Sequence, residues 1–452
     1  MPSAFLYLGI MLAAIIIWFV LFKRPVYEAV LISFLIIVAV TNSWENIFVF
    51  IDNALSTSLI FSMIAFVALS QLLEKTKIID SCISIVLALL GRIPGGAGYV
   101  SVIASSFMGA LSGSGPGNVM TTGALTIPAM KKTGFPPELA ANVESNASYL
   151  GNMIPPSSNI VAAFGALLAV CPDNTISQGE FWIILWSIAG YFILQRIAMV
   201  FIFCKYYKVQ PMEKSELPSI KETLKTGWQG LMLPVIILLP FMLDSWFKEG
   251  FFTDRLGATG AKYMSSSILL FIAGVAAIYA IIIVKDKKIV TPHAMAKMFS
   301  KGAKSLVAPI ATCLFGYMIG EVFADLGVSA ELQAFIADIN LGKLGMVLFI
   351  TIFTCFLGMV IPGSSLVVVF GPAFITALAS VGVNPILAAA MLPCICGVMC
   401  GITPPLALGM YAGMSLAGSD FSKTVKNGLW WVFAQYVLEV VVLMGWLPIL
   451  GL

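Results

Sequence analysis

Residues 4–22 form an apolar stretch without a charged side chain, long enough to cross a lipid bilayer as one helix. Similar stretches follow along the chain, and 60% of its 452 residues are hydrophobic whereas 10% are charged. This composition lies outside the range of soluble domains and indicates a membrane protein with many spans. No basic segment precedes residues 4–22 and no A-x-A pattern follows them, so we expect a retained helix rather than a signal peptide.

A glycine-rich hexapeptide interrupts the apolar sequence, because residues 112–117 read SGSGPG. Glycine and proline break helices, and backbone freed from a helix at membrane depth must lie against protein or line a polar cavity. The apolar segments on either side are each long enough to cross about half a bilayer as helices. We therefore predict a re-entrant hairpin over residues 97–131.

The same order of interruptions returns 248 or 249 residues later in the chain. We predict a second hairpin over residues 344–379, with its turn at 362–365. After each hairpin a double proline interrupts an apolar span, which predicts broken helices over 137–170 and 384–417. The repeat rests on these matches: Gly134 with Gly382, Pro137 with Pro385, Pro155–Pro156 with Pro404–Pro405, and SGSGPG with IPGSSL at 361–366.

Lysine and arginine gather on one side of the predicted membrane. When the N-terminus is placed outside, Arg196 falls within a span, four of the 25 basic residues fall outside, and all others lie inside. The positive-inside rule therefore predicts that both termini are outside. In this threading the span near 55–73 runs inward and its counterpart, 305–324, runs outward, so the two repeats are inverted. The four basic residues outside are Lys248, Arg255, Lys262 and Lys343.

Inverted repeats with interrupted apolar segments are typical of secondary transporters. We therefore predict an all-α polytopic membrane protein with two re-entrant hairpins and two broken transmembrane helices. The predicted divisions are N-terminal scaffold helices at 1–50, a first repeat at 51–208, connecting scaffold helices and cytoplasmic loops at 209–300, and a second repeat at 301–452.

Neutral oxygen donors cluster at the predicted turns and breaks. Freed carbonyls and hydroxyls suit Na+, and the N-termini of half-helices suit a carboxylate. The alternative is that these small residues only allow close helix packing. We expect the Na+ ligands among Ser112, Gly113, Ser114, Asn118, Gly151, Asn152, Pro155, Gly363, Ser364, Ser365, Gly401, Thr403 and Pro404. We expect substrate contacts from Ser114, Ser157, Ser364 and Thr403.

Two charged residues lie inside predicted spans, where ionisable groups are costly and usually face the interior of the helix bundle. Glu144 precedes the first double proline, and is a candidate coupling charge or one member of a structural pair. Arg196 is a candidate contact for an anionic substrate, or else forms a scaffold ion pair or extends toward the inner face. The sequence leaves both choices open.

The regions that carry these features resemble a known family. Residues 109–158, which include SGSGPG and the first double proline, are similar to the signature region of the large membrane subunit of TRAP (tripartite ATP-independent periplasmic) transporters. Residues 381–421 are similar to the C-terminal repeat of that family. SGSGPG and the VES around Glu144 look closer to the TAXI-type branch than to the dicarboxylate branch. The resemblance covers most of residues 50–440.

The resemblance implies the ion-transporter superfamily architecture and Na+-coupled uptake of an organic anion across the inner membrane of a bacterium. It further implies an elevator-type movement of the hairpins and broken helices against a scaffold. The expected partners are an extracytoplasmic solute-binding protein and a small four-helix membrane subunit, besides the anion and the lipid bilayer. The two spans before residue 50 are too few to be that subunit, so we expect a separate one. We expect no cofactor beyond the coupling ion Na+, and no nucleic acid.

Other functions remain as alternatives. A stand-alone Na+/carboxylate symporter of the same superfamily would need no binding protein. An intramembrane enzyme would need a catalytic constellation at membrane depth, whereas the single histidine of the chain, His293, lies in a polar loop. We therefore expect a transporter and no enzyme activity. A channel is a further alternative, although paired hairpins suit alternating access better.

Overall fold

The computed structural model describes residues 3–56, 58–76, 78–112, 115–172, 176–213, 217–247, 251–328, 331, 341–359, 362–404 and 407–452. Every regular element within these residues is a helix, which confirms the all-α prediction. Three helical segments of the described residues are long and apolar enough to cross a membrane, and a pair of helices bent by 42° would make a fourth. The three are Gln178–Tyr207, Gly363–Ser380 and Pro385–Ile402; the pair is Pro137–Met153 with Ser158–Val170.

Two groups of helices build the molecule. The first group, here called the outer group, consists of α1 (Ser3–Ile16), η1 (Ile17–Leu21), α2 (Val26–Val40), η2 (Trp44–Asn46), α3 (Ile47–Ser56), α4 (Ser58–Thr76), α5 (Ile78–Leu90), α11 (Ile220–Phe247), α12 (Thr253–Ile283), η5 (Lys287–Val290) and α13 (Pro292–Asp325). The second, the central group, consists of α6 (Gly96–Ser112), α7 (Gly115–Lys132), α8 (Pro137–Leu150), η3 (Gly151–Met153), α9 (Ser158–Val170), α10 (Gln178–Tyr207), α15 (Lys343–Gly358), α16 (Gly363–Ser380), α17 (Pro385–Leu392), η6 (Pro393–Val398), α18 (Met399–Ile402), α19 (Leu408–Ala417) and α20 (Phe421–Leu443).

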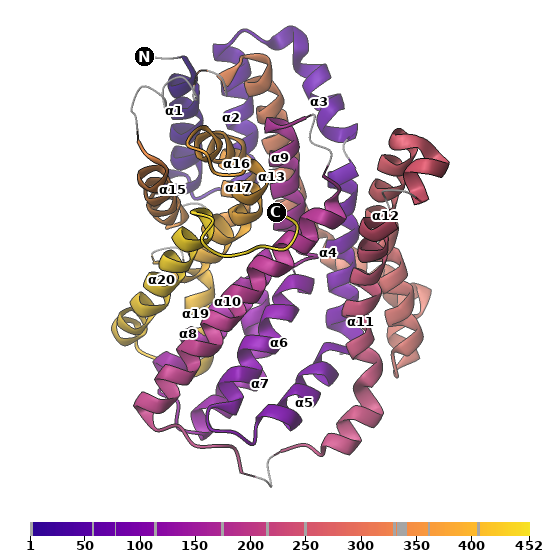
Figure 1. The fold of residues 1–452 in the computed structure, drawn as a ribbon, viewed down its shortest axis with the longest axis vertical. Helices are drawn as coiled ribbons and strands as arrows, with labels where there is room; N and C mark the ends of the chain where they lie inside the picture. The colour runs from indigo at the N-terminus through magenta and orange to yellow at the C-terminus, as the bar shows by residue number, and fades with distance from the viewer. Residues whose placement is uncertain are drawn as a thin grey trace.

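Helices from the two ends of the chain pack together in the central group. The helix α8 packs against α6 and α7 of the first hairpin and against α19 and α20 from the C-terminal part of the chain, and α19 also packs against α7 (Figure 1). Within the outer group, α13 packs against α2, α3 and α4, and α12 packs against α4 and α11. The two groups meet where α13 contacts α16, where α4 and α5 contact α6, where α4 contacts α9, and where α11 contacts α10.

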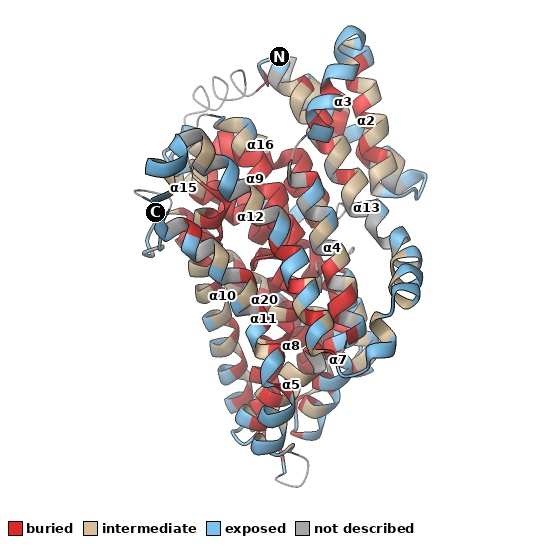
Figure 2. Ribbon diagram, turned by 90° about the vertical axis from the view of Figure 1, so that its right-hand side faces the viewer, coloured by how far each residue is buried: buried red, intermediate tan, exposed pale blue. Residues whose placement is uncertain are grey.

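The most deeply buried part of the molecule is the first broken helix. Every residue from Leu139 to Leu150 is buried, although this stretch includes several polar side chains and one carboxylate. Figure 2 shows the buried residues concentrated in the interior and the exposed ones along the flanks and ends of the molecule. A polar helix in such a place has its side chains satisfied by protein groups or by a ligand.

The two hairpins have shorter turns than the sequence predicts. The helix α6 runs to Ser112 and α7 starts at Gly115, so only Gly113 and Ser114 separate them, and both lie outside the described residues. The predicted turn at 362–365 was wrong at its C-terminal end, because α16 begins at Gly363 with Pro362 as its N-cap. Glycine and proline fit there because the first turn of a helix leaves its N–H groups unpaired anyway.

Both broken helices are interrupted by one extended residue directly before the double proline. Ile154 has φ −100° and ψ 125°, and Thr403 has φ −102° and ψ 118°. The helix starts Pro137 and Pro385 are 248 positions apart, whereas the two extended residues are 249 apart. The second broken helix accommodates the extra residue in a π-helical turn, η6, since a π turn inserts one residue into an α-helix.

The last helix, α20, covers Phe421–Leu443. Its first turn is fixed by Asp420, whose side chain accepts a hydrogen bond from the Lys423 N–H. Lys423 and Lys426 therefore belong to this helix.

Candidate functional site

The tip of the first hairpin is in direct contact with the first helix break, η3. A Cβ atom added to Gly151 would lie 2.3 Å from the carbonyl carbon of Gly109 and 2.4 Å from the amide nitrogen of Ala110. A Cβ added to Gly109 would lie 2.3 Å from the Ser148 carbonyl oxygen. The backbone of α6 thus touches the backbone of η3, and only glycine at both positions allows this approach.

The second repeat makes the matching contact. Gly358 and Cys400 stand 249 positions after Gly109 and Gly151, and a Cβ on Gly358 would lie 2.9 Å from the Cys400 Cβ. The N–H of Gly363, at the start of α16, donates a hydrogen bond to the Cys400 thiol at 3.0 Å. Each hairpin tip is therefore seated on the break that follows it in the chain.

Contacts across the centre join the two repeats. The Asn152 amide donates to the Gly397 carbonyl at 3.3 Å, which links the first break to the π turn of the second broken helix. The predicted Na+ residues Asn152 and Gly401 thus lie in one region, because η3 packs on η6 and α8 packs on α18.

Tyr149 is a residue of this region that the sequence did not indicate. Its buried ring is in contact with three glycines, and a Cβ on any of them would lie within 2.5 Å of the ring. The three are Gly115 at the tip of the first hairpin, Gly401 at the second break, and Gly409 in α19. Tyr149 therefore fixes the relative positions of a hairpin and a break from opposite repeats.

Asn118 is the predicted ligand with a free oxygen. It is fully buried, and its amide nitrogen donates to the Ser105 carbonyl at 2.7 Å. Its Oδ1 has no hydrogen-bond partner among the described residues. A buried acceptor oxygen without a donor is costly, and it suits a cation.

The remaining predicted residues lie around the same tips and breaks. The Ser157 hydroxyl caps α9 by accepting from the Asn159 N–H at 3.3 Å, and the Thr403 hydroxyl donates to the Met399 carbonyl at 2.8 Å. Ser365 is buried in the first turn of α16 and Ser364 is half-buried beside it. Pro155 is buried, its peptide bond to Pro156 is cis, and Pro404 is half-buried. Ser112 ends α6; Gly113 and Ser114 are outside the described residues.

Helix N-termini and helix C-termini both lie at the hairpin tips and helix breaks. The N-termini of α7, α9, α16 and α19 and the C-termini of α6, α15 and α18 all lie at a tip or a break. Unpaired N–H groups at a helix N-terminus favour an anion, and unpaired carbonyls at a C-terminus favour a cation. The arrangement can therefore hold an anionic group and a small cation near each other.

Glu144 is held by hydroxyl groups instead of a basic residue. It is fully buried, and its Oε1 accepts from Thr122 at 2.5 Å and from Ser148 at 2.9 Å. Its Oε2 accepts from Ser101 at 2.7 Å and from Thr126 at 2.5 Å. The prediction of a structural pair with a basic residue is therefore wrong among the described residues, because four neutral donors already occupy the carboxylate.

Arg196 lies in a second buried polar cluster. The Glu439 carboxyl group of α20 lies in the same cluster and both side chains are buried, but they make no hydrogen bond to each other: Arg196 Nε and Nη2 and Glu439 Oε2 have no hydrogen-bond partner among the described residues. Glu439 accepts from the Gln435 amide at 2.7 Å, and Gln435 also contacts Cys394. The cluster joins α10 to α20 inside the central group. Arg196 is therefore buried near an opposite charge, but the ion pair predicted as one alternative is not formed among the described residues.

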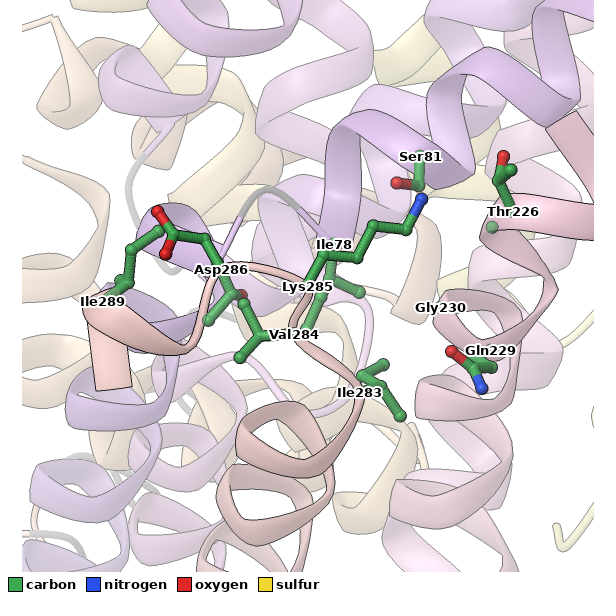
Figure 3. Close-up of a pocket in the computed structure, with 12 residues that line it drawn as sticks. Ile78, Ser81, Thr226, Gln229, Gly230, Ile283, Val284, Lys285, Asp286 and Ile289 are labelled. Atoms are coloured by element: carbon green, nitrogen blue, oxygen red, sulfur yellow. The ribbon is translucent and has the colours of Figure 1, made fainter. Parts of the chain in front are cut away.

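A cavity of about 350 Å³ lies apart from this region, between α4, α5, α11 and the end of α12. Figure 3 shows the Lys285 side chain reaching toward Ser81, while the Asp286 carboxylate points another way. None of the predicted site residues lines it. The candidate site is therefore the set of tips and breaks, and not this cavity.

Comparison with known proteins identifies the chain's relatives. A family model described as the DctM component of tripartite ATP-independent periplasmic transporters matches residues 6–450. The chain belongs to the DctM family. It is a large permease subunit of a membrane transporter, as the resemblance predicted; the TAXI-type branch stays a prediction.

Individual DctM relatives match over most of their length. The C4-dicarboxylate TRAP transporter large permease protein DctM of Vibrio cholerae is 25% identical over 403 residues, covering 85% of this chain and 84% of that protein. The 2,3-diketo-L-gulonate TRAP transporter large permease protein YiaN of Escherichia coli is 25% identical over 392 residues, covering 84% of each. The solved structure of Neisseria gonorrhoeae MtrF superposes with a TM-score of 0.63 at 15% identity, covering 92% of this chain and 86% of that one. This likeness confirms the transporter fold.

Proposed function

We propose that this DctM-family chain couples the entry of Na+ to the uptake of a small carboxylate across the bacterial inner membrane. The observation that carries the proposal is the seating of each hairpin tip on its own helix break, with helix ends of both signs at the same place. Irregular backbone at membrane depth is tolerated where it lines a cavity or is buried in protein, and secondary transporters bind ions and substrate there.

The Na+ ligands are the oxygens at the tips and breaks. Asn118 contributes its Oδ1, which has no hydrogen-bond partner among the described residues, Ser112 ends α6, and Gly151 lies at the junction of α8 and η3. In the second repeat the equivalent region contains Gly363, Ser364 and Thr403. The full proposed set is Ser112, Gly113, Ser114, Asn118, Gly151, Asn152, Pro155, Gly363, Ser364, Ser365, Gly401, Thr403 and Pro404.

The substrate is a carboxylate held by half-helix N-termini and hydroxyls, with Ser114, Ser157, Ser364 and Thr403 as contacts. Two relatives are named for C4-dicarboxylates and for 2,3-diketo-L-gulonate, which are both carboxylates. The positive ends of the α9 and α16 helix dipoles are suited to such a group.

The movement proposed for transport is a displacement of the central group against the outer group. Small residues bring the groups together: a Cβ on Gly316 of α13 would lie 1.9 Å from Val368 of α16, and one on Gly165 of α9 would lie 2.3 Å from the Tyr317 hydroxyl of α13. The proposed partners are a four-helix membrane subunit and an extracytoplasmic binding protein, and both termini of this chain are proposed to face outward on the distribution of basic residues.

Reconstitution in liposomes tests this function. The chain is reconstituted alone, with the small membrane subunit, and with both that subunit and the binding protein, and uptake of labelled C4-dicarboxylate and 2,3-diketo-L-gulonate is measured. The proposal expects uptake only with all three components and only with an inward Na+ gradient. Uptake by the chain alone would identify a stand-alone symporter instead, and uptake that is equal in a choline gradient would contradict Na+ coupling.

A further inference from the structure

The carboxylate of Glu144 joins three separate helices. Its four hydroxyl donors come from α6 (Ser101), from α7 (Thr122 and Thr126), and from its own helix α8 (Ser148). All four donors are almost completely buried, as Glu144 is. Both arms of the first hairpin are therefore attached to the broken helix through one side chain.

No positive charge compensates this carboxylate among the described residues. Lys131, on the same helix as two of the donors, uses its amine to donate to the Ala417 carbonyl at 2.7 Å. An ionised carboxyl group without a cation is costly at membrane depth and is sustained here by hydroxyl donors alone. None of the ionisable groups on Glu144's own helix or on the helices packed around it is a hydrogen-bond partner of Glu144. These groups are Tyr99, Lys131, Lys132, Glu138, Tyr149, Glu180, Tyr191, Arg196, Cys204, Lys205, Tyr206, Tyr207, Cys394, Cys396, Cys400, Tyr411, Lys423, Lys426, Tyr436 and Glu439.

The donors are arranged so that the carboxyl group can also be neutral. The Thr122 hydroxyl lies 2.8 Å from the Asn118 carbonyl, and the Thr126 hydroxyl lies 3.1 Å from the Thr122 carbonyl. A hydroxyl has one hydrogen to donate and two lone pairs that accept. When Glu144 gains a proton, its O–H donates to a threonine oxygen, and that threonine turns its own hydrogen to the carbonyl of α7. No buried polar group then loses its partner.

We propose that Glu144 is a proton-binding site, and that its protonation loosens the first hairpin from α8. The proton comes from water and forms an O–H bond on the carboxylate, and it returns to water when the carboxylate is restored. Hydrogen bonds to an ionised acceptor are about twice as strong as neutral ones, so the hairpin is held tightly only while Glu144 is charged. Because Glu144 is inaccessible in this conformation, its proton exchanges only when the hairpin parts from α8. This inference deepens the proposed transport function and rests on it.

Infrared spectroscopy of the purified full-length chain tests proton binding. The difference between spectra at low and high pH contains the C=O bands of all carboxyl groups that gain a proton, so the difference spectrum of each variant is subtracted from that of the parent. Glu144→Gln is expected to lose one C=O component, which Glu138→Gln, a matched change in the same helix, and Glu439→Gln, at the other buried carboxyl group, are expected to keep. The absence of any component that only Glu144→Gln removes, at every pH where the protein is folded, would overturn the proposal.

Hydrogen exchange tests the loosening. Glutamine imitates the protonated acid, so amides of α7 in Glu144→Gln are expected to exchange about tenfold faster than in the parent at the same pH, with no change in Glu138→Gln. Equal exchange in all three proteins contradicts the proposal. If Glu144→Gln does not fold, Thr126→Val keeps the carboxyl group and removes one of its donors on α7, and its α7 amides are expected to exchange faster than in the parent; equal exchange contradicts the proposal.

The melting temperature with Na+ and with choline is measured on the same samples. If Na+ raises the melting temperature but the C=O band of Glu144 is absent, the proton site is rejected and the Na+ function stands. If the band is present but Na+ does not raise the melting temperature, the Na+ function is rejected and the proton site stands.

Discussion

The contact between Gly109 and Gly151 makes a sharp prediction about the seating of the first hairpin. In Gly151→Ala the new Cβ would lie 2.3 Å and 2.4 Å from backbone atoms of Gly109 and Ala110, whereas real Cβ atoms essentially never approach a heavy atom within 3.0 Å. Backbone cannot rotate aside as a side chain can, so α6 and η3 must separate. Overpacking of this kind costs about 1–3 kcal/mol.

A second glycine supplies the matched control. Gly190 lies in α10, and a Cβ there would meet no atom within 4 Å. Gly190→Ala is expected to leave the protein unchanged or to stabilise it by up to about 1 kcal/mol, since alanine is the better helix former. The same chemical change is thus predicted to act in opposite directions at the two sites.

Thermal unfolding followed by tryptophan fluorescence measures the difference, with Na+ and with choline. Gly151→Ala should melt below the parent in both salts, because the clash exists with or without the ion. A melting temperature of Gly151→Ala equal to that of Gly190→Ala would refute the close contact. A loss confined to the Na+ samples would mean that Gly151 acts only through the ion.

Three further predictions concern other contacts. Gly401→Ala would place a Cβ 1.9 Å from the Tyr149 ring, so it should destabilise the protein. Adding Tyr149→Leu should recover part of this loss, and no recovery would show that the two residues are not in contact. Arg196→Met removes a positive charge that attracts the buried Glu439 carboxyl group, so it should destabilise the protein, and Arg196→Met combined with Glu439→Gln should cost less than the sum of the two single losses; additive losses would show that the charges do not interact. Cysteines introduced as Lys131→Cys and Lys343→Cys should react with an impermeant thiol reagent from opposite faces of the membrane, and reaction from one face would contradict the inverted threading.

Much of the fold could be predicted from the sequence, because backbone polar groups inside a membrane must be hydrogen-bonded within the protein and few structures achieve this. Glycine and proline in apolar sequence mark where helices end, and their recurrence marked both hairpins and both breaks. The helix starts at Gly115 and Gly363 were not predicted. Glycine and proline at these positions were interpreted as parts of a turn, but the first turn of a helix also accepts both residues. The distance between matching residues of the two repeats changes from 248 to 249 along the broken helices. This change was visible in the sequence, but only the structure shows that the extra residue lies in a π turn.

The polar interior was less predictable than the fold. The sequence singled out Glu144 and Arg196, but their partners come from other helices, and neither the hydroxyls around Glu144 nor Glu439 carries a local signal. Tyr149 could not be found, because its role depends on glycines from three distant segments.

Equilibrium binding of radioactive sodium to the purified chain tests the central claim most directly. The parent and Gly190→Ala are expected to bind sodium saturably, and Asn118→Ala, which removes the unpartnered buried oxygen, is expected to bind it at least tenfold more weakly while still folding. Saturable binding that is equal in the parent and in Asn118→Ala would remove the Na+ site from the first hairpin. The absence of saturable binding in the parent would contradict Na+ coupling by this chain.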